Sequence, residues 1–344
     1  MVDVGVVGFG KMGVLHAGIL NALEDVRVTA IAERDGVLRN YVKKIFPHIK
    51  MYDDATKMCE QAALDIVYIT TPVLSHLPVA ISCIKNNINF FMEKPLAANL
   101  GEAKKLCQEL CKHNIIHSVG YNRRFTDTFV KAKELLDLGT IGEVHEVNSS
   151  IYLSTVFSKT SSSIAKKAER GGVLLDLGIH VVDLLIWYFG YVKKVSGKTG
   201  STQAGGLEDS AHMEIEFENK ARGLFDASWS VQGYRLPEIN LEISGSNGKM
   251  RVSDDFIETD LKKSVPHLKD TRMKIYKQQL CTPIPFDLGG ADYVKEDMHM
   301  VNCVKEKRQS FVNVFEATKS QSVIEAMHEC VGNGEQEVEY IDKT

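Results

Sequence analysis

Residues 2–13 read VDVGVVGFGKMG, a β-branched run followed by glycines in the spacing G-x-G-x-x-G. The apolar spacing after this run is that of a helix, and the next β-branched segment, VRVTAIAE, ends at Glu33. The acid follows the last glycine by about twenty residues, an interval typical of dinucleotide-binding folds. A strand, a glycine turn, a helix, a second strand and an acid in this order predict a dinucleotide site, with a purely structural glycine turn as the alternative.

Each glycine of this motif has its own physical task. Gly8 permits the tight turn, Gly10 lets a pyrophosphate approach the backbone, and Gly13 lets the helix pack closely on the strand. The helix N-terminus attracts phosphate because its free N–H groups and its dipole favour an anion. The other residues that we expect to line this turn are Phe9, Lys11 and Met12.

Glu33 and Arg34 bear on the choice between NAD and NADP. The Glu33 carboxylate is expected to hydrogen-bond the ribose hydroxyls of the adenosine half, and its charge repels a 2′-phosphate. The Arg34 guanidinium could tolerate that phosphate, or it could be a solvated loop residue. We therefore expect NAD as the cofactor, with NADP possible.

Strand-like segments alternate with helical ones through the first third of the chain. Strands are expected at 65–71, 89–94 and 115–121, and helices near 76–87 and 100–113. This alternation predicts an α/β fold with a doubly wound parallel Rossmann sheet, in which ligands lie beyond the carboxyl ends of the strands. The residues at these ends are Thr70, Thr71, Pro72, Glu93, Lys94, Pro95, Tyr121 and Asn122.

Lys94 lies between Glu93 and Pro95 at one of these strand ends, which is not the usual setting of a surface lysine. A functional ammonium group and a Glu–Lys pair on the rim of the sheet both explain this position.

From residue 123 the pattern changes to period-2 segments such as SAHMEIEFE, ARGLFDASWSV and LPEINLEIS, without helices between them. This pattern predicts an α+β domain with a large, mainly antiparallel sheet flanked by helices. We therefore place a dinucleotide-binding Rossmann domain at 1–122 and a substrate-binding and oligomerisation domain at 123–344. Large apolar groups alternate along GLFDASWSV, so the uncovered sheet face is expected to pack on a second copy in a homodimer or homotetramer.

Composition narrows the possible partners. The 344 residues are 44% hydrophobic and 25% charged, as in ordinary globular proteins. A net charge of −4 gives no electrostatic reason to expect a nucleic acid or a membrane surface as partner, and no apolar run approaches the ~20 residues of a membrane span. The 7 cysteines never occur as C-x-x-C, so we expect reduced thiols in a cytoplasmic protein, with no signal peptide and no metal site.

Residues 171–185, GGVLLDLGIHVVDLL, are almost wholly apolar apart from Asp176, His180 and Asp183. On a regular helix these three side chains share one face. Their burial costs on the order of several kcal/mol unless they are paired or solvated. Asp176 and His180 either satisfy each other in a core or line a cleft, and Asp183 is expected to be a structural anchor through a backbone or arginine contact.

Five motifs in order resemble those of the glucose-fructose oxidoreductase / inositol dehydrogenase / rhizopine catabolism (Gfo/Idh/MocA) family: GFGKMGxxH, TTPxxxH, EKPL, YNRRF and GGVLLDLGIHVVDL. The likeness covers essentially the whole chain. It implies an NAD(P)-dependent dehydrogenase or reductase acting on CH–OH groups, with Lys94, Asp176 and His180 as the catalytic trio. It also implies a cofactor-binding set near the nicotinamide, made of Thr70, Thr71, Pro72, His76, Glu93, Lys94 and Asn122.

The chemistry of these groups agrees with such a reaction. An imidazole with an ordinary pKa near ~6.5 can accept the proton of a hydroxyl group at neutral pH. The Lys94 ammonium group can hydrogen-bond the same oxygen and stabilise developing alkoxide charge. Asp176 can contact the substrate hydroxyls or hold the His180 imidazole in position.

The resemblance implies a sugar, a nucleotide sugar or an inositol-type polyol as substrate. The loop SKTSSSIAKKAER carries Lys166 and Lys167, which could receive the phosphates of a nucleotide sugar or could lie in a solvated loop. Arg123, Asp176 and His180 complete the candidate substrate-binding set. Two other functions remain open: a dinucleotide-binding sensor without turnover, and a reductase of a non-sugar compound.

Overall fold

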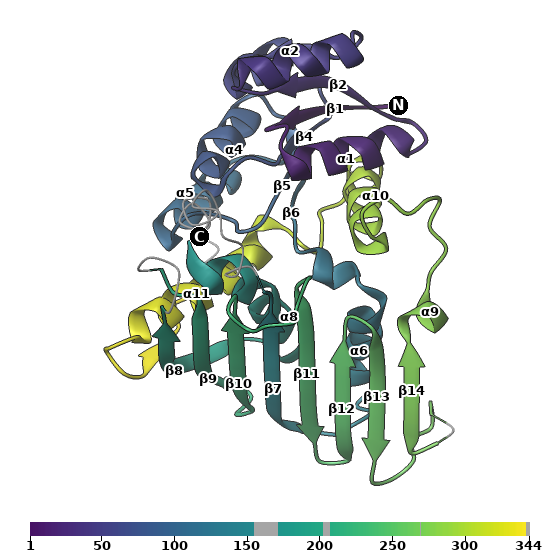
Figure 1. The fold of residues 1–344 in the computed structure, drawn as a ribbon, viewed down its shortest axis with the longest axis vertical. Coiled ribbons are helices and arrows are strands. Elements are labelled where there is room, and N and C mark those ends of the chain that lie inside the picture. Colours follow the sequence, from purple (N-terminus) through teal and green to yellow (C-terminus); the bar gives the residue numbers. More distant parts are fainter. Residues whose placement is uncertain (155–170, 202–206, 269, 342–344) are drawn as a thin grey trace. The chain divides into compact units, whose positions relative to one another are not determined.

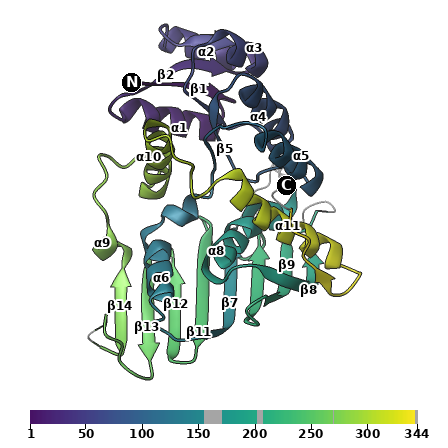
Figure 2. The ribbon, with the colours of Figure 1, turned by 180° about the vertical axis from the view of Figure 1, so that it is seen from behind.

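The computed structural model describes residues 1–154, 171–201, 207–268 and 270–341. These residues form two compact units, whose elements are labelled in Figure 1 and seen from behind in Figure 2. The first unit holds Met1–Asn122, Ile284–Thr318 and Ile341, and the second holds Arg123–Pro283 and Lys319–Tyr340. One division between the units thus falls at the expected boundary after residue 122, but Ile284–Thr318 packs with the first unit.

A six-stranded parallel sheet forms the centre of the first unit, in the order β3-β2-β1-β4-β5-β6 (Figure 1). The order reverses between β1 and β4, and ligands of doubly wound sheets bind at such a reversal. The predicted Rossmann sheet is confirmed. Its strands are β1 (Val2–Val7), β2 (Val26–Ala32), β3 (Lys50–Tyr52), β4 (Ile66–Ile69), β5 (Asn89–Met92) and β6 (His117–Val119).

Some helices of this unit begin after residues that cap their free N–H groups, and α1 begins after Gly10. Asp35 and Asn99 cap α2 and α5 through hydrogen bonds from backbone N–H groups to their side chains. Helix α10 packs against α1, so a late segment of the chain completes the unit. The helical elements are α1 (Lys11–Ala22), α2 (Gly36–Ile45), α3 (Ala55–Gln61), the 3₁₀ turn η1 (Val73–Ser75), α4 (His76–Lys85), α5 (Leu100–Leu110) and α10 (Ala291–Lys305). The 3₁₀ turn η2 (Asn122–Phe125) begins at Asn122 and continues into the second unit.

Three strands of this sheet end earlier than their apolar runs suggest, at Ile69, Met92 and Val119. Side chains after these ends make further contacts: the Thr70 hydroxyl, for example, donates to the carbonyl oxygens of Val7, the last residue of β1, and of Gly8 in the turn that follows. Pro95 has no N–H to give to a sheet ladder. Polar residues thus follow β4 and β5 directly, at Thr70 and Glu93.

The second unit is built on a nine-stranded sheet in the order β14-β13-β12-β11-β7-β10-β9-β8-β15. All neighbouring strands are antiparallel except the β7–β10 pair, which is parallel. The mainly antiparallel sheet with flanking helices is thus confirmed. The strands are β7 (Val144–Tyr152), β8 (Val192–Gly200), β9 (Ser210–Phe217), β10 (Arg222–Ser228), β11 (Glu238–Gly245), β12 (Gly248–Ser253), β13 (Phe256–Leu261), β14 (Arg272–Tyr276) and β15 (Gln336–Glu337).

Helices pack on one face of this sheet: α6 contacts β12 and β13, and α8 contacts β7. The remaining helical elements are α6 (Asp127–Asp137), the π-helical turn η3 (Leu174–Gly178), α8 (Ile179–Phe189), α9 (Lys277–Leu280) and α11 (Val314–Cys330).

The expectation that the other sheet face is strongly apolar is wrong. Phe225 and Trp229 are buried, whereas the alternating positions of β10 are Arg222, Leu224 and Asp226. The same alternation places buried side chains on one face of β9 and β12 and charged ones on the other. Phe225 and Trp229 of GLFDASWSV therefore pack in the core on the helix-covered face, whereas Leu224 of β10 is an exposed apolar residue.

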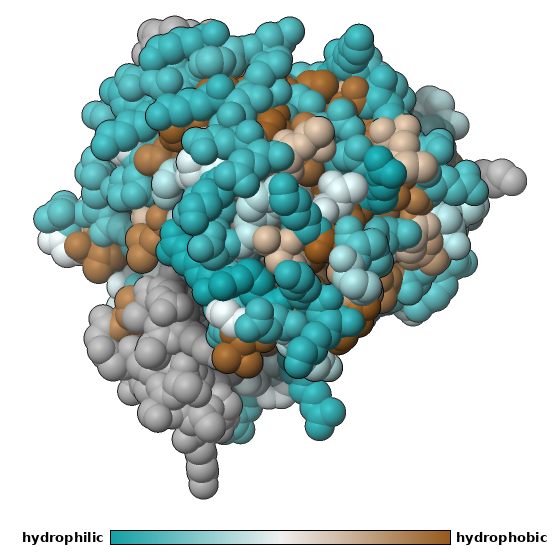
Figure 3. Space-filling model, turned by 90° about the horizontal axis from the view of Figure 1, so that it is seen from above, coloured by the Kyte–Doolittle hydropathy of each residue, from teal (hydrophilic) through white to brown (hydrophobic). Residues whose placement is uncertain are grey.

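Within the described residues, no helix has both the length and the apolarity needed to cross a bilayer. On the face seen in Figure 3, hydrophobic side chains form small groups among hydrophilic ones. Scattered groups of this size are normal on protein surfaces.

Candidate active site

The turn after β1 has the geometry that the glycine spacing predicts. Gly8 has a φ of +85°, a left-handed conformation that residues with a Cβ rarely adopt. A Cβ on Gly13 would lie 2.1 Å from the carbonyl oxygen of Gly8, so only glycine lets α1 begin this close to β1. A Cβ on Gly10 would meet no atom of the described residues within 4 Å. Packing therefore does not require glycine at position 10, and the space is open to a ligand.

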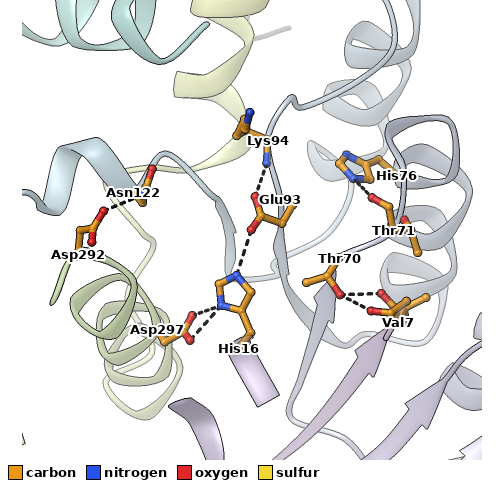
Figure 4. A network of polar contacts seen from close by, with 11 residues as sticks. Val7, His16, Thr70, Thr71, His76, Glu93, Lys94, Asn122, Asp292 and Asp297 are labelled. Carbon is orange, nitrogen blue, oxygen red and sulfur yellow. Dashed lines mark hydrogen bonds and ion pairs between the residues drawn. The ribbon is translucent and has the colours of Figure 1, made fainter. Parts of the chain in front are cut away.

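The first turn of α1 is prepared for an anion. Gly10 precedes the helix and has no side chain to cap its free N–H groups, and the first turn contains no acidic residue. Uncapped N–H groups and the helix dipole together favour phosphate. Beside this turn, the Thr70 hydroxyl donates to the carbonyl oxygens of Val7 at 3.0 Å and Gly8 at 2.7 Å (Figure 4). These features fit the pyrophosphate of a dinucleotide.

The remaining residues of the predicted turn differ in exposure. Phe9 is buried in the core of the unit, Met12 is half-buried and Lys11 is exposed. An exposed ammonium group in the first helical turn adds positive charge where phosphate is expected.

Glu33 lies directly after β2 with its carboxylate held by the backbone. Its Oε2 accepts a hydrogen bond from Phe9 N at 2.7 Å, and its Oε1 accepts one from Asp35 N at 2.9 Å. The charge is thereby fixed next to the glycine turn, where it favours a ribose diol over a 2′-phosphate. Arg34 is exposed, and Arg39 donates to the carbonyl oxygens of both Glu33 and Arg34.

The turns after β4 and β5 are joined by His76, the first residue of α4. Its Nδ1 lies 2.9 Å from the Pro95 carbonyl oxygen. Its Nε2 lies 3.0 Å from the Thr71 carbonyl oxygen (Figure 4). Burial lowers the pKa of His76, and a neutral imidazole can donate to one of these two carbonyls. Pro72 is exposed at the start of the same turn.

A chain of polar contacts links the end of β5 to α1 and α10 (Figure 4). Lys94 N donates to Glu93 Oε2 at 3.2 Å, and Glu93 Oε1 lies 3.1 Å from His16 Nε2. The other ring nitrogen, His16 Nδ1, lies 2.8 Å from Asp297 Oδ1. Next to this chain, Asn122 Nδ2 donates to Asp292 Oδ2 at 2.7 Å.

The structure thus brings one predicted set together at the carboxyl edge of the first sheet. Its members follow the carboxyl ends of β4, β5 and β6, as the Rossmann pattern requires. They are Thr70, Thr71, Pro72, His76, Glu93, Lys94 and Asn122.

Asp176 and His180 belong to the second unit. The expectation that they lie on one regular helix is wrong, because Leu174–Gly178 forms a π-helical turn and α8 begins only at Ile179. The i→i+5 hydrogen bonds of a π turn alter the spacing of side chains around the axis, and such turns are frequent at functional sites. Asp176 is buried with 9% exposure, and His180 is half-buried.

Asp183 is a structural anchor, as predicted. Its carboxylate accepts two hydrogen bonds from Arg124, from Nε at 2.8 Å and from Nη2 at 2.7 Å. Ser320 Oγ donates to the same carboxylate at 3.3 Å. Both charged side chains are almost fully buried, so this ion pair fixes α8 close to His180.

The remaining substrate candidates give less support to a phosphate site. The Arg123 guanidinium is paired with Asp254, which leaves it less available to a ligand. Lys166 and Lys167 lie outside the described residues.

The motif GFGKMGxxH includes His16, but the sequence does not reveal its two carboxylate partners, Asp297 and Glu93. Asp297 is 281 residues away along the chain, and no local pattern connects the two positions. The position of His16 three residues after Gly13, in GFGKMGxxH, was the available signal.

A doubly wound sheet with this glycine turn, an uncapped helix N-terminus and a fixed acid after β2 defines a dinucleotide-binding Rossmann protein. The model of the GFO/IDH/MocA oxidoreductase family with NAD-binding Rossmann fold matches residues 2–121, and that of the GFO/IDH/MocA C-terminal domain matches 129–251. The chain belongs to this family and is an NAD(P)-dependent oxidoreductase, which confirms the predicted resemblance, enzyme class and cofactor.

Similar proteins include myo-inositol 2-dehydrogenase of Thermotoga maritima, 30% identical over 265 residues that cover 74% of this chain and 76% of that protein. The scyllo-inositol 2-dehydrogenase (NADP(+)) of Bacillus subtilis is 27% identical over 263 residues, 73% of this chain and 72% of that protein. Among solved structures, levoglucosan dehydrogenase in complex with NADH and levoglucosan has a TM-score of 0.88 at 21% identity, covering 98% of this chain and 99% of that one. This last likeness concerns the fold.

Proposed function

We propose that this protein oxidises a secondary hydroxyl group of an inositol-type polyol or a sugar, with NAD as hydride acceptor. The observation that carries the proposal is the presence of Lys94, Asp176 and His180 in a chain whose similar proteins include inositol 2-dehydrogenases. The sheet edge that carries Lys94 also carries the residues expected around a nicotinamide.

In this proposal His180, Lys94 and Asp176 each have a different role in the reaction of the hydroxyl group. His180 accepts the proton of the reacting hydroxyl, a role to which an imidazole is suited. The Lys94 ammonium hydrogen-bonds the same oxygen and stabilises its developing negative charge. Asp176 orients the imidazole or a neighbouring substrate hydroxyl. NAD, when bound, supplies the acceptor for the hydride.

The preference for NAD follows from Glu33. Its carboxylate is fixed by two backbone N–H groups at the glycine turn, where the adenosine ribose is expected. A relative that uses NADP(+) shows that the wider family accepts the phosphorylated cofactor, so NADP is the alternative to test.

The proposal is tested by following NADH formation at alkaline pH with inositols, free aldoses and UDP-sugars. We expect turnover of an inositol or a free sugar, and a loss of at least about 100-fold in kcat for Lys94→Ala and His180→Ala. Lys105→Ala and His113→Ala are matched controls, because both side chains are exposed. Normal turnover by either active-site variant would refute the role given to that residue.

The same experiment separates the other candidate functions. Tight NADH binding without turnover of any polyol or sugar would support a sensor or a reductase of a non-sugar compound. Turnover of UDP-sugars but not of inositols or free sugars would point to a nucleotide-sugar substrate.

We also infer that the exposed sheet face of the second unit mediates homodimer or homotetramer formation. Leu224 is 39% exposed on this face, among acidic and basic side chains such as Glu214, Arg222 and Arg251. An apolar residue within charges of both signs suits a self-complementary interface. Leu224→Asp should lower the mass measured by sedimentation, whereas Leu138→Asp, at an exposed position after α6, should not. An unchanged mass for Leu224→Asp would exclude this face.

A further inference from the structure

His16 is a fully buried titratable residue near the predicted nicotinamide site. The side chain is 0% exposed on α1, and the rings of Tyr68, Phe91 and Tyr293 pack around it at centroid distances of 5.4, 5.0 and 6.2 Å. An imidazole in such surroundings must have both ring nitrogens satisfied by specific partners.

Both partners of His16 are carboxylates. Nδ1 lies 2.8 Å from Asp297 Oδ1, and Nε2 lies 3.1 Å from Glu93 Oε1. Carboxylates only accept hydrogen bonds when ionised, so an imidazolium, with two N–H donors, satisfies both contacts. Burial alone would lower the pKa of His16, but Asp297 and Glu93 outweigh burial and raise it well above the ordinary value.

Glu296, the residue before Asp297, adds a further buried carboxyl group to this cluster. Its side chain is 2% exposed, and neither carboxylate oxygen has a hydrogen-bond partner in the described part of the chain. Burial raises the pKa of Glu296 well above its usual range, and the nearby Glu93 charge raises it further. Burial and the Glu93 charge thus both favour the neutral form of Glu296, while an imidazolium at His16 offsets the charge of one of its two carboxylate partners.

The cluster reaches the proposed catalytic lysine through Glu93. While Glu93 Oε1 contacts His16, its Oε2 accepts a hydrogen bond from the backbone N–H of Lys94 at 3.2 Å. Glu93 N donates to Ile69 O at 2.9 Å, so backbone and side chain are both fixed. Figure 4 shows the Lys94 side chain directed away from His16, so His16 does not act on the ammonium group directly.

We propose that His16 is a positioning residue: anchored by Asp297 on α10, its imidazolium holds the Glu93 carboxylate, which in turn fixes the backbone of Lys94. The inference rests on the proposed function only in assigning catalysis to Lys94. Such support matters because catalytic groups must be held within about 0.5 Å of their productive geometry, and an error of about 1 Å can cost roughly 100-fold in rate.

The first test measures the position of Lys94 without any substrate. Amide hydrogen exchange of the full-length protein, followed by mass spectrometry, compares wild type with His16→Phe, which keeps a ring but removes both donors. We expect the Lys94 amide to exchange at least about fivefold faster in His16→Phe, while the strands of the first sheet keep their protection. His113→Phe, at an exposed position, is the matched control. A smaller change at Lys94 would overturn the proposal.

The second test is a double-mutant cycle in kcat, with myo-inositol and NAD+ as probes. We expect His16→Phe to lose about 10- to 100-fold in kcat while the Kd for NADH changes less than about threefold. In the Lys94→Ala background, His16→Phe should lower log kcat by less than half as much as it does in the wild type, because its effect passes through Lys94. An equal loss in both backgrounds would show that His16 acts elsewhere and would overturn the proposal.

These outcomes separate the inference from the proposed function. If Lys94→Ala keeps normal turnover, or myo-inositol is not a substrate, the proposed function fails in that respect, and the amide exchange of Lys94 still decides the role of His16. If His16→Phe does not fold, Asp297→Asn takes its place in both tests, since it removes the anchor of the imidazolium and keeps the ring. Unchanged Lys94 exchange in a folded Asp297→Asn would equally refute the proposal.

Discussion

Replacement of Asp183 by asparagine should destabilise the second unit strongly. The Arg124 and Asp183 side chains are 3% and 1% exposed, and two parallel hydrogen bonds of 2.8 and 2.7 Å join them. Asp183→Asn keeps the shape of the side chain but leaves the buried guanidinium without its counter-charge. Removing one partner of a buried pair costs about 3–5 kcal/mol. At about 1.4 kcal/mol per tenfold, the unfolding equilibrium should shift by two to three and a half orders of magnitude.

Urea denaturation followed by circular dichroism would measure this loss in free energy of unfolding. The control is Asp137→Asn, which breaks the i,i+4 pair with Lys133 on the surface of α6 and should cost no more than about 0.5 kcal/mol. Replacing both Arg124 and Asp183 by leucine should cost less than Asp183→Asn, because no buried charge remains. A loss below about 1 kcal/mol for Asp183→Asn would refute the argument from an uncompensated buried charge.

Three further predictions concern the first unit. Glu33→Ala should raise the ratio of kcat/KM with NADP to that with NAD by at least about tenfold, because the charge that repels a 2′-phosphate is lost; an unchanged ratio would exclude this role. Gly13→Ala should abolish NADH binding in fluorescence titrations, since its Cβ would lie 2.1 Å from Gly8 O; retained binding would mean that α1 can shift. Glu296 keeps a proton on folding that the unfolded chain releases, so the stability of the wild type should fall as pH rises above the ordinary carboxyl pKa. Glu296→Gln should flatten this fall in Tm between about pH 5 and 8 and raise Tm at the upper end, and equal slopes for the two proteins would contradict it.

The fold was largely predictable because its signals are local. The glycine turn, the alternation of strands and helices, and the period-2 segments after residue 123 all lie within short stretches. The π-helical turn at Leu174–Gly178 was not predictable, since the apolar run around Asp176 suits a regular helix equally well. The side of the sheet that Phe225 and Trp229 face depends on tertiary packing, which periodicity alone does not give.

The candidate site was predictable only in part, for a related reason. Lys94 and the neighbouring strand-end residues follow apolar runs, so their place at the carboxyl edge could be inferred. The contacts of His16 with Asp297 and of Asn122 with Asp292 join positions 281 and 170 residues apart. Nothing in the sequence around either partner marks such pairs.

The return of Ile284–Thr318 to the first unit has a consequence for biosynthesis. When residue 122 has emerged from the ribosome, every strand of the parallel sheet has been made. Asp297, the anchor of His16, and Val312, whose carbonyl accepts a hydrogen bond from Val119 N, have not yet been synthesised. At about 5–20 residues per second, several seconds to tens of seconds pass before these residues emerge. During that interval His16 lacks its anchor, so the nascent nucleotide-binding half should be sensitive to proteases and dependent on chaperones until translation is nearly finished.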